Sequence, residues 1–134
     1  MALAKVFSLT LIDVNEQIVA NDVEVLANAR GNRDQGVDTK ECILTQVLCR
    51  NFGTANVTFG IRVGAGARNP ITGVRDFINP GGGAYNQIVA PGAFYRFEID
   101  DYVPYMIVVA QAAIGGAHPV QVYIDGFTMP GASE

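Results

Sequence analysis

The residues that could carry out nucleophilic chemistry are few in this sequence and poorly placed for it. His118 is the only histidine. A serine nucleophile would need His118 as its base, with Ser8 or Ser133 as the attacking group. Neither serine stands in the strand–turn–helix setting that exposes such a nucleophile. We therefore expect His118 to begin a strand, and we predict no catalytic residue and no enzymatic activity.

Cys42 and Cys49 are predicted to be buried thiols. They lie seven residues apart in a segment, 41–50, with the composition of one strand. An odd separation places their side chains on opposite faces, about 23 Å apart at a rise of about 3.3 Å per residue. A disulfide needs Cα atoms within about 7 Å, and zinc ligands must converge on one point. Free thiols of this kind are typical of a protein made in a reducing compartment.

The densest acidic group contains Glu98, Asp100 and Asp101, and folding could bring Asp125 near them. Several close oxygen ligands suit Ca²⁺, and a pair of carboxylates is what a glycosidase uses. The sequence has no calcium-loop pattern, however, and nothing beyond proximity supports a glycosidase. We interpret the group as a solvated strand end, and we predict no metal and no cofactor.

Two glycine-rich tracts resemble phosphate-binding loops only superficially. Residues 64–69 begin like a dinucleotide fingerprint but lack its third glycine, and they lead into Pro70 instead of a helix. Residues 81–83 are followed by neither a Lys-Ser/Thr pair nor a helix. Because the helix N-terminus that would hold a phosphate is missing, both tracts are predicted to be loops.

The composition indicates a surface that is partly covered. Hydrophobic residues make up 49% of the 134 residues and charged residues only 16%, against about a quarter in an average soluble protein. Such a chain is expected to bury part of its surface between subunits. The net charge of −4 argues against a nucleic-acid-binding protein. A local basic patch of Arg62, Arg68 and Arg75 is the remaining alternative.

The second half of the chain has the alternation of β-strands. In residues 93–100, Ala93, Tyr95, Phe97 and Ile99 share one face, and residues 56–63 alternate in the same way. In that second run Asn56, Thr58, Gly60 and Arg62 are expected to point outward. Residues 105–114 are apolar on both faces, so we expect this strand to lie centrally or at a subunit interface. A further strand is predicted at 120–127.

The first half is less regular. Residues 5–14 and 41–50 are predicted to be strands, the second of them central because both of its faces are apolar. Residues 17–20 and 23–27 favour a hairpin, although a short helix capped by Asn21 or Asp22 fits nearly as well. Residues 28–39 are polar and are expected to form a surface loop or a mobile segment. The apolar run near the N-terminus is too short to span a membrane.

Together these elements predict an all-β protein: an antiparallel β-sandwich or jelly roll of about seven to eight strands. We expect one domain over residues 1–134. The long connection at 64–83 is expected to be functional, to contact a partner or to be mobile.

Aromatic residues that the pattern leaves outward could stack on a sugar or form a subunit contact. With charge so sparse, we favour the subunit contact. The predicted interface residues are Phe94, Tyr102, Tyr105, Ile107, Val109 and Tyr123.

The layout of residues 41–127 resembles that of small β-sandwich proteins of tailed bacteriophage virions, particularly capsid decoration or cementing proteins. The shared features are a turn at residues 51–53 before a strand, a loose loop, a Pro91-Gly92 turn before an aromatic strand, and a closing Val-Tyr-Ile strand. The resemblance implies a trimer or other symmetric homo-oligomer that clamps a major capsid protein lattice, with part of residues 1–40 acting as an N-terminal arm. It also implies a virion location after synthesis in the host cytoplasm, with no direct contact to nucleic acid or membrane.

A second hypothesis is a carbohydrate- or ligand-binding β-sandwich module. It would present tyrosine, asparagine and aspartate side chains from the 64–83 loop and from the turn at 98–105.

Overall fold

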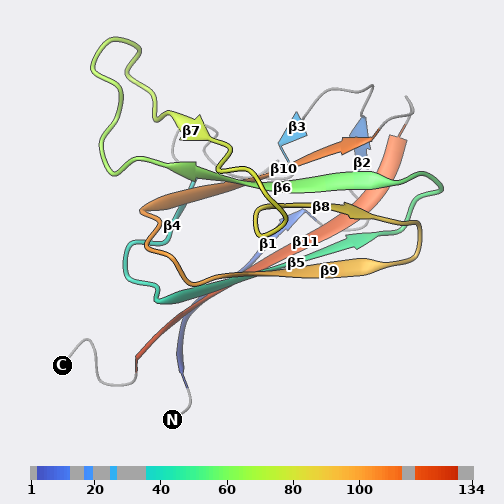
Figure 1. Ribbon diagram of the computed structural model, residues 1–134, viewed down its shortest axis with the longest axis horizontal. Helices are drawn as coiled ribbons and strands as arrows, with labels where there is room; N and C mark the ends of the chain where they lie inside the picture. Colours follow the sequence, from blue (N-terminus) through green and yellow to red (C-terminus); the bar gives the residue numbers. More distant parts are fainter. Residues whose placement is uncertain (1–2, 13–16, 20–24, 27–35, 113–116, 130–134) are drawn as a thin grey trace.

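The computed structural model describes residues 3–12, 17–19, 25–26, 36–112 and 117–129, which form eleven strands in two antiparallel sheets (Figure 1). The sheets face each other as a β-sandwich, so the predicted fold class is confirmed. The described strands outnumber the predicted ones because several are only two to four residues long. The described residues contain no helix that could cross a membrane.

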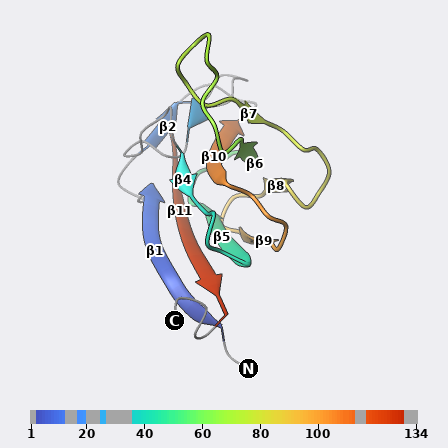
Figure 2. The same ribbon diagram turned by 90° about the vertical axis from the view of Figure 1, so that its left-hand side faces the viewer.

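The first sheet has the strand order β1-β11-β5-β9, and the short strand β2 also pairs with β11. The first and last long strands of the described chain therefore lie side by side and curve together along the molecule (Figure 2). The bounds of these strands are β1 (Ala4–Ile12), β2 (Gln17–Val19), β5 (Leu44–Asn51), β9 (Phe94–Ile99) and β11 (Ala117–Thr128).

The second sheet has the order β3-β10-β6-β7, with β4 also paired to β10 and β8 to β6. Its two long strands pair in register from Tyr105 opposite Gly64 to Ala112 opposite Val57. The bounds are β3 (Val25–Leu26), β4 (Val37–Asp38), β6 (Val57–Gly64), β7 (Phe77–Ile78), β8 (Asn86–Val89) and β10 (Tyr105–Ala112).

The core lies between the sheets and follows from the period-two alternation of the long strands. One face of each long strand is buried against the other sheet. Fully burying a valine, isoleucine, phenylalanine or methionine side chain contributes about 1.5–3 kcal/mol to the stability of the fold. The buried side chains include Val47 and Cys49 of β5, Val57, Phe59 and Ile61 of β6, Phe97 and Ile99 of β9, Met106 and Val108 of β10, and Val122 and Ile124 of β11.

The outer face of β6 differs from the prediction. Gly60 and Arg62 were expected to point to solvent, but both are buried. The Arg62 side chain lies across Gly60, where a Cβ would come within 2.5 Å of Nη1. Nη1 also donates to Oδ1 of Asn86 on β8 at 2.9 Å. The absence of a side chain at Gly60 thus gives the Arg62 side chain room to lie along the sheet.

The predicted hairpin at 17–27 is wrong. β2 pairs with β11 in the first sheet and β3 pairs with β10 in the second, so this segment crosses between the layers. Each short strand gains its hydrogen bonds from a longer strand, which a two-stranded hairpin on its own could not match. The alternative helix caps, Asn21 and Asp22, lie outside the described residues.

The polar segment 28–39 is only partly described, and its last residues are not a surface loop. Val37 and Thr39 are buried, and β4 pairs with the first residues of β10. The Thr39 hydroxyl donates to the carbonyl oxygen of Val103, and the Thr39 amide donates to that of Pro104 at 2.9 Å. Backbone pairing with β10 and these two hydrogen bonds hold residues 37–39 against the sheet, although the segment is polar in composition. Residues 28–35 lie outside the described part.

Candidate functional site

The residues considered for nucleophilic chemistry do not come together. Ser8 lies on β1 opposite Asp125, whereas His118 is buried at the start of β11, at the opposite end of that long strand. His118 lies beside the turn at Gly53, where a Cβ would be 3.6 Å from its Nδ1. The expectation that His118 begins a strand is confirmed. Ser133 lies outside the described residues.

Both cysteines are buried free thiols, as predicted. The strand is shorter than expected, because β5 begins at Leu44 and leaves Cys42 in the turn before it. Cys49 lies in the core, and burial raises the pKa of its thiol. Burial also raises the pKa of Cys42, partly offset by a hydrogen bond with Thr45. Among the described residues, no three His, Cys, Asp or Glu side chains are grouped as metal ligands would be.

The acidic residues are spread over the first sheet and its edge. Glu98 of β9 and Asp125 of β11 share an outer-face row but are separated by Gln46 of β5, which places them about 10 Å apart at the usual strand spacing. Asp125 lies 4.0 Å from the Lys5 ammonium. Asp101 accepts a hydrogen bond from the Tyr85 hydroxyl at 2.7 Å. The acidic side chains therefore lie in different environments and do not form one cluster.

The alternative of a basic patch is also wrong. Arg62 and Arg75 are buried, and only Arg68 is exposed. Both buried guanidinium groups donate hydrogen bonds within the chain, Arg62 to Asn86 and Arg75 to the carbonyl oxygens of Ala65 and Gly66.

The six predicted interface residues fall into two groups. Phe94 and Tyr102 are exposed, at 62% and 70%, while Tyr105 and Tyr123 are half-buried. Ile107 and Val109 lie on the outer face of β10 but are buried within the chain. The strand is central in its sheet, as its two apolar faces predicted. That these six residues form a subunit contact stays a prediction, and it rests on the accessible four.

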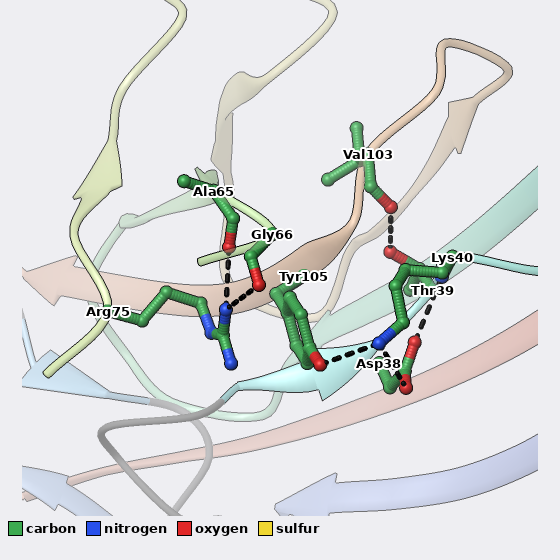
Figure 3. A network of polar contacts seen from close by, with 8 residues as sticks. All are labelled: Asp38, Thr39, Lys40, Ala65, Gly66, Arg75, Val103 and Tyr105. Atoms are coloured by element: carbon green, nitrogen blue, oxygen red, sulfur yellow. Dashed lines mark hydrogen bonds and ion pairs between the residues drawn. The ribbon is translucent and has the colours of Figure 1, made fainter. Parts of the chain in front are cut away.

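Tyr105 anchors a network at the start of β10 (Figure 3). The Arg75 guanidinium carbon lies 3.4 Å from the centroid of its ring. The Lys40 ammonium lies 4.8 Å from the centroid and donates to the Tyr105 hydroxyl at 2.8 Å. Lys40 also pairs with Asp38 at 3.4 Å. The hydrogen bond with Tyr105 is the main cause that raises the pKa of Lys40.

Three apolar side chains are exposed at intervals along β1 and at the residue before it, and β1 is an edge strand of the first sheet. Leu3, Val6 and Leu9 are exposed by 37%, 39% and 45%, and we call these three residues the β1 strip. One side of β1 pairs with β11, and no strand within the described ranges pairs with the other side. Leu9 lies opposite the buried Ile124, so it belongs to the inner face at a place where the second sheet leaves that face uncovered.

A cleft of about 390 Å³ opens at the end of the sandwich where β6 finishes and β10 begins. It lies between the loop that follows β6 and the turn before β10, and we call it the end cleft. Its apolar walls come from Val63, Ile78, Pro80, Val103 and Pro104.

The polar groups of the end cleft are two tyrosines and two carboxylates: Tyr85, Tyr102, Asp76 and Asp101. Tyr85 donates its hydroxyl to Oδ2 of Asp101, and Asn69 donates to Oδ2 of Asp76 at 3.0 Å. Burial, followed by the hydrogen bond with Asp101, raises the pKa of Tyr85 to about 12. Neutral donors therefore hold both carboxylates in place.

Comparisons with known proteins give distant similarities only. No protein-family model and no curated protein matches the sequence. Among solved structures, the crystal structure of PirA is similar with 12% identity and a TM-score of 0.38, covering 90% of this chain and 91% of that one. The coat protein of Tobacco streak virus has 13% identity and a TM-score of 0.43, covering 93% and 87%. Both similarities are too distant to carry a functional conclusion.

Sequence reasoning found the two segments of the end cleft but not the cleft itself. In the second hypothesis the 64–83 loop and the 98–105 turn present ligand-binding side chains, and the structure brings these two segments together. The β1 strip was missed. Its exposed leucines had the same alternating pattern as core residues, and only the extent of the facing sheet distinguishes the two.

Proposed function

We propose that this chain is a non-enzymatic structural assembly protein: a virion component that forms a homo-oligomer and packs on a capsid surface. The observation that carries the proposal is the β1 strip. A long edge strand with exposed apolar side chains is a natural site for pairing with another chain.

The charge distribution along the two outer strands of the first sheet supports the choice of β1. Lys5 is the only charged residue of β1, whereas β9 at the opposite edge exposes Arg96 and Glu98. Charged side chains on an edge strand discourage unwanted pairing. The β9 edge therefore has a protection that β1 largely lacks.

The bulges of β1 define how a second copy would dock. The register with β11 shifts between Lys5 and Phe7 and again between Thr10 and Ile12. Bulges shorten the stretch over which a new strand can pair, leaving about four residues in regular register. Side-chain packing of the β1 strip would consequently contribute more to the contact than backbone hydrogen bonds.

The virion placement rests on the layout of residues 41–127, which resembles capsid decoration proteins, and on the low charge of the chain. A closed symmetric oligomer, such as a trimer, would cover the β1 strips of all copies. Exposed aromatic residues such as Phe94 and Tyr102 would remain available to a capsid lattice.

The oligomer is tested by light scattering coupled to size-exclusion chromatography at micromolar concentration. We expect the wild-type chain to be oligomeric and the double variant Val6→Lys/Leu9→Lys to be a monomer with an unchanged circular dichroism spectrum. The matched control is Ile88→Lys, which changes an equally apolar residue, 68% exposed, on β8. A monomeric wild type would overturn the proposal. If the double variant does not fold, the single variant Val6→Lys carries the test, because Val6 lies within the shift of register and outside the core.

The virion placement has its own test. Virions would be purified from the source of the chain and analysed by mass spectrometry. We expect peptides of this chain at a fixed ratio to those of the major capsid protein. An oligomeric chain that is absent from virions would retain the assembly role and remove the virion placement.

A further inference from the structure

The end cleft combines an apolar floor with negative charge that no cation in the described chain balances. Asp76 and Asp101 line it, and none of its other lining residues is charged. Neither Asp76 nor Asp101 forms an ion pair with another described residue; Lys5 pairs with Asp125 and Lys40 with Asp38, both outside the cleft.

The arginines of the surrounding segments are already engaged in other contacts. Arg75, the neighbour of Asp76 in sequence, donates to the carbonyl oxygens of Ala65 and Gly66 and stacks on Tyr105. Arg68 donates to the carbonyl oxygen of Gly73 at 3.2 Å. Arg62 donates to Asn86. A cation that balances the cleft would therefore come from outside the described chain.

Each carboxylate of the cleft keeps one oxygen for a ligand. The hydrogen bonds from Tyr85 and Asn69 both reach Oδ2 atoms, of Asp101 and Asp76 respectively. Oδ1 of either residue is free of a hydrogen bond or ion pair within the described residues. The raised pKa of Tyr85 is consistent with a partly dry, negatively charged setting.

We propose that the end cleft binds an arginine side chain presented by a partner protein. The aliphatic stem would lie on the apolar walls formed by Val63, Val103 and Pro104, and the guanidinium would meet Asp101 and Asp76. Arginine suits this arrangement because its planar group stacks on aromatic rings and donates to several oxygens in fixed directions. The exposed ring of Tyr102 supplies such a surface.

A sugar fits the same cleft less well. Sugars carry a hydroxyl on most carbons and need many hydrogen-bonding groups, yet most of the lining residues are apolar. A volume of about 390 Å³ lies within the usual range of ligand sites, about 300–1,000 Å³, so size alone does not decide between them. Charge complementarity favours the cation. The inference is independent of the proposed oligomer, since no residue of β1 lines the cleft.

The test is an NMR titration of the full ¹⁵N-labelled chain with Nα-acetyl-arginine methylamide. We expect saturable amide shifts at Gly64, Ala65, Asp101 and Tyr102, with millimolar affinity. The citrulline analogue is the matched probe, because it has the same shape without the charge. It should bind about tenfold more weakly, as expected for the loss of a charge-assisted hydrogen bond.

Two variants locate the effect. Asp101→Asn keeps an oxygen for the Tyr85 hydroxyl and should weaken arginine binding about tenfold. Asp100→Asn, a neighbouring exposed carboxylate that does not line the cleft, should leave the affinity unchanged. If Asp101→Asn disturbs the spectrum as a whole, Asp76→Asn takes its place.

Three results would overturn the proposal. The first is the absence of amide shifts at the cleft with the arginine probe. The second is binding of the citrulline probe with the same affinity as the arginine probe. The third is a loss of arginine affinity that is equal for Asp100→Asn and Asp101→Asn. Saturable shifts with methyl α-glucoside but not with the arginine probe would assign the cleft to carbohydrate instead.

Discussion

The guanidinium group of Arg75 stacks on the ring of Tyr105, with its central carbon 3.4 Å from the ring centroid. The same guanidinium donates to the carbonyl oxygens of Ala65 and Gly66 at 2.7 and 2.8 Å (Figure 3). Arg75 therefore ties the loop that leaves β6 to the first residue of β10. This contact closes one end of the second sheet and sets the position of the loop that lines the end cleft.

Replacing Arg75 by methionine should destabilise the protein by about 1–3 kcal/mol. The variant keeps an apolar stem but loses the stacking on Tyr105 and the two hydrogen bonds. Urea denaturation measures the difference. The matched control is Arg68→Met, whose exposed side chain makes one hydrogen bond to Gly73, and it should change stability by less than about 0.5 kcal/mol. Equal effects of the two variants would contradict the role of Arg75.

Asn51→Ala should be among the most destabilising substitutions of a polar residue, at about 2–4 kcal/mol. Asn51 is buried, and its Nδ2 donates to the carbonyl oxygens of Ala55 and Val89 at 2.8 and 2.9 Å. Its Oδ1 accepts from the Gly53 amide at 2.9 Å. Removing the side-chain amide of Asn51 leaves the two carbonyl oxygens and the Gly53 amide without this hydrogen-bond partner. Thermal unfolding measures the loss.

The control for this substitution is Asn56→Ala, which changes an exposed asparagine in the turn before β6. It should leave the melting temperature nearly unchanged. A melting temperature of Asn51→Ala equal to that of Asn56→Ala would show that water replaces the lost contacts.

The two thiols should differ in reactivity. In the native protein Cys49 should be protected from Ellman's reagent, because it is fully buried and burial raises the pKa of its thiol. Cys42 is buried less deeply and should react first, yet more slowly than a thiol in urea-unfolded chain. The reaction rate of Cys49→Ser reports on Cys42 alone, and that of Cys42→Ser reports on Cys49 alone. Faster reaction at Cys49 would contradict the described core.

Stability should fall as the pH rises from about 10 to about 12. In the unfolded chain the Tyr85 phenol ionises near its ordinary pKa of 10.0, and in the folded chain near about 12. Between these values the unfolded chain releases a proton that the folded chain retains, so unfolding becomes more favourable. Urea denaturation at about pH 9 and about pH 11 measures this loss. Tyr85→Phe should reduce the loss, whereas Tyr102→Phe, at an exposed ring, should not.

The long strands could be predicted from the sequence because their alternation has one physical cause, burial of one face against another sheet. Phe97 and Ile99 are buried as the pattern of β9 indicated. The same reasoning failed for Arg62, because burial of its side chain depends on the space above Gly60, which no local pattern specifies. It also failed for β2 and β3, since their partners are distant in sequence.

The candidate surfaces could be predicted only in part, for a related reason. Leu9 and Leu11 are the same residue type and lie on the same face of the predicted alternation, yet Leu9 is 45% exposed and Leu11 is buried. What separates them is how far the second sheet extends over β1. Tyr102 was expected to be accessible and is, because it lies in a turn between two sheets.

The central position of β11 has a consequence for synthesis of the chain. β11 (Ala117–Thr128) holds both β1 and β5 by backbone pairing. Until the ribosome has made β11, β1 lacks its partner in the first sheet and β5 can pair only with β9, so the sheet stays incomplete. Long-range pairing of this kind is slow and leaves apolar strands uncovered in the meantime. The first sheet should therefore reach its full strand order only after β11 has been made.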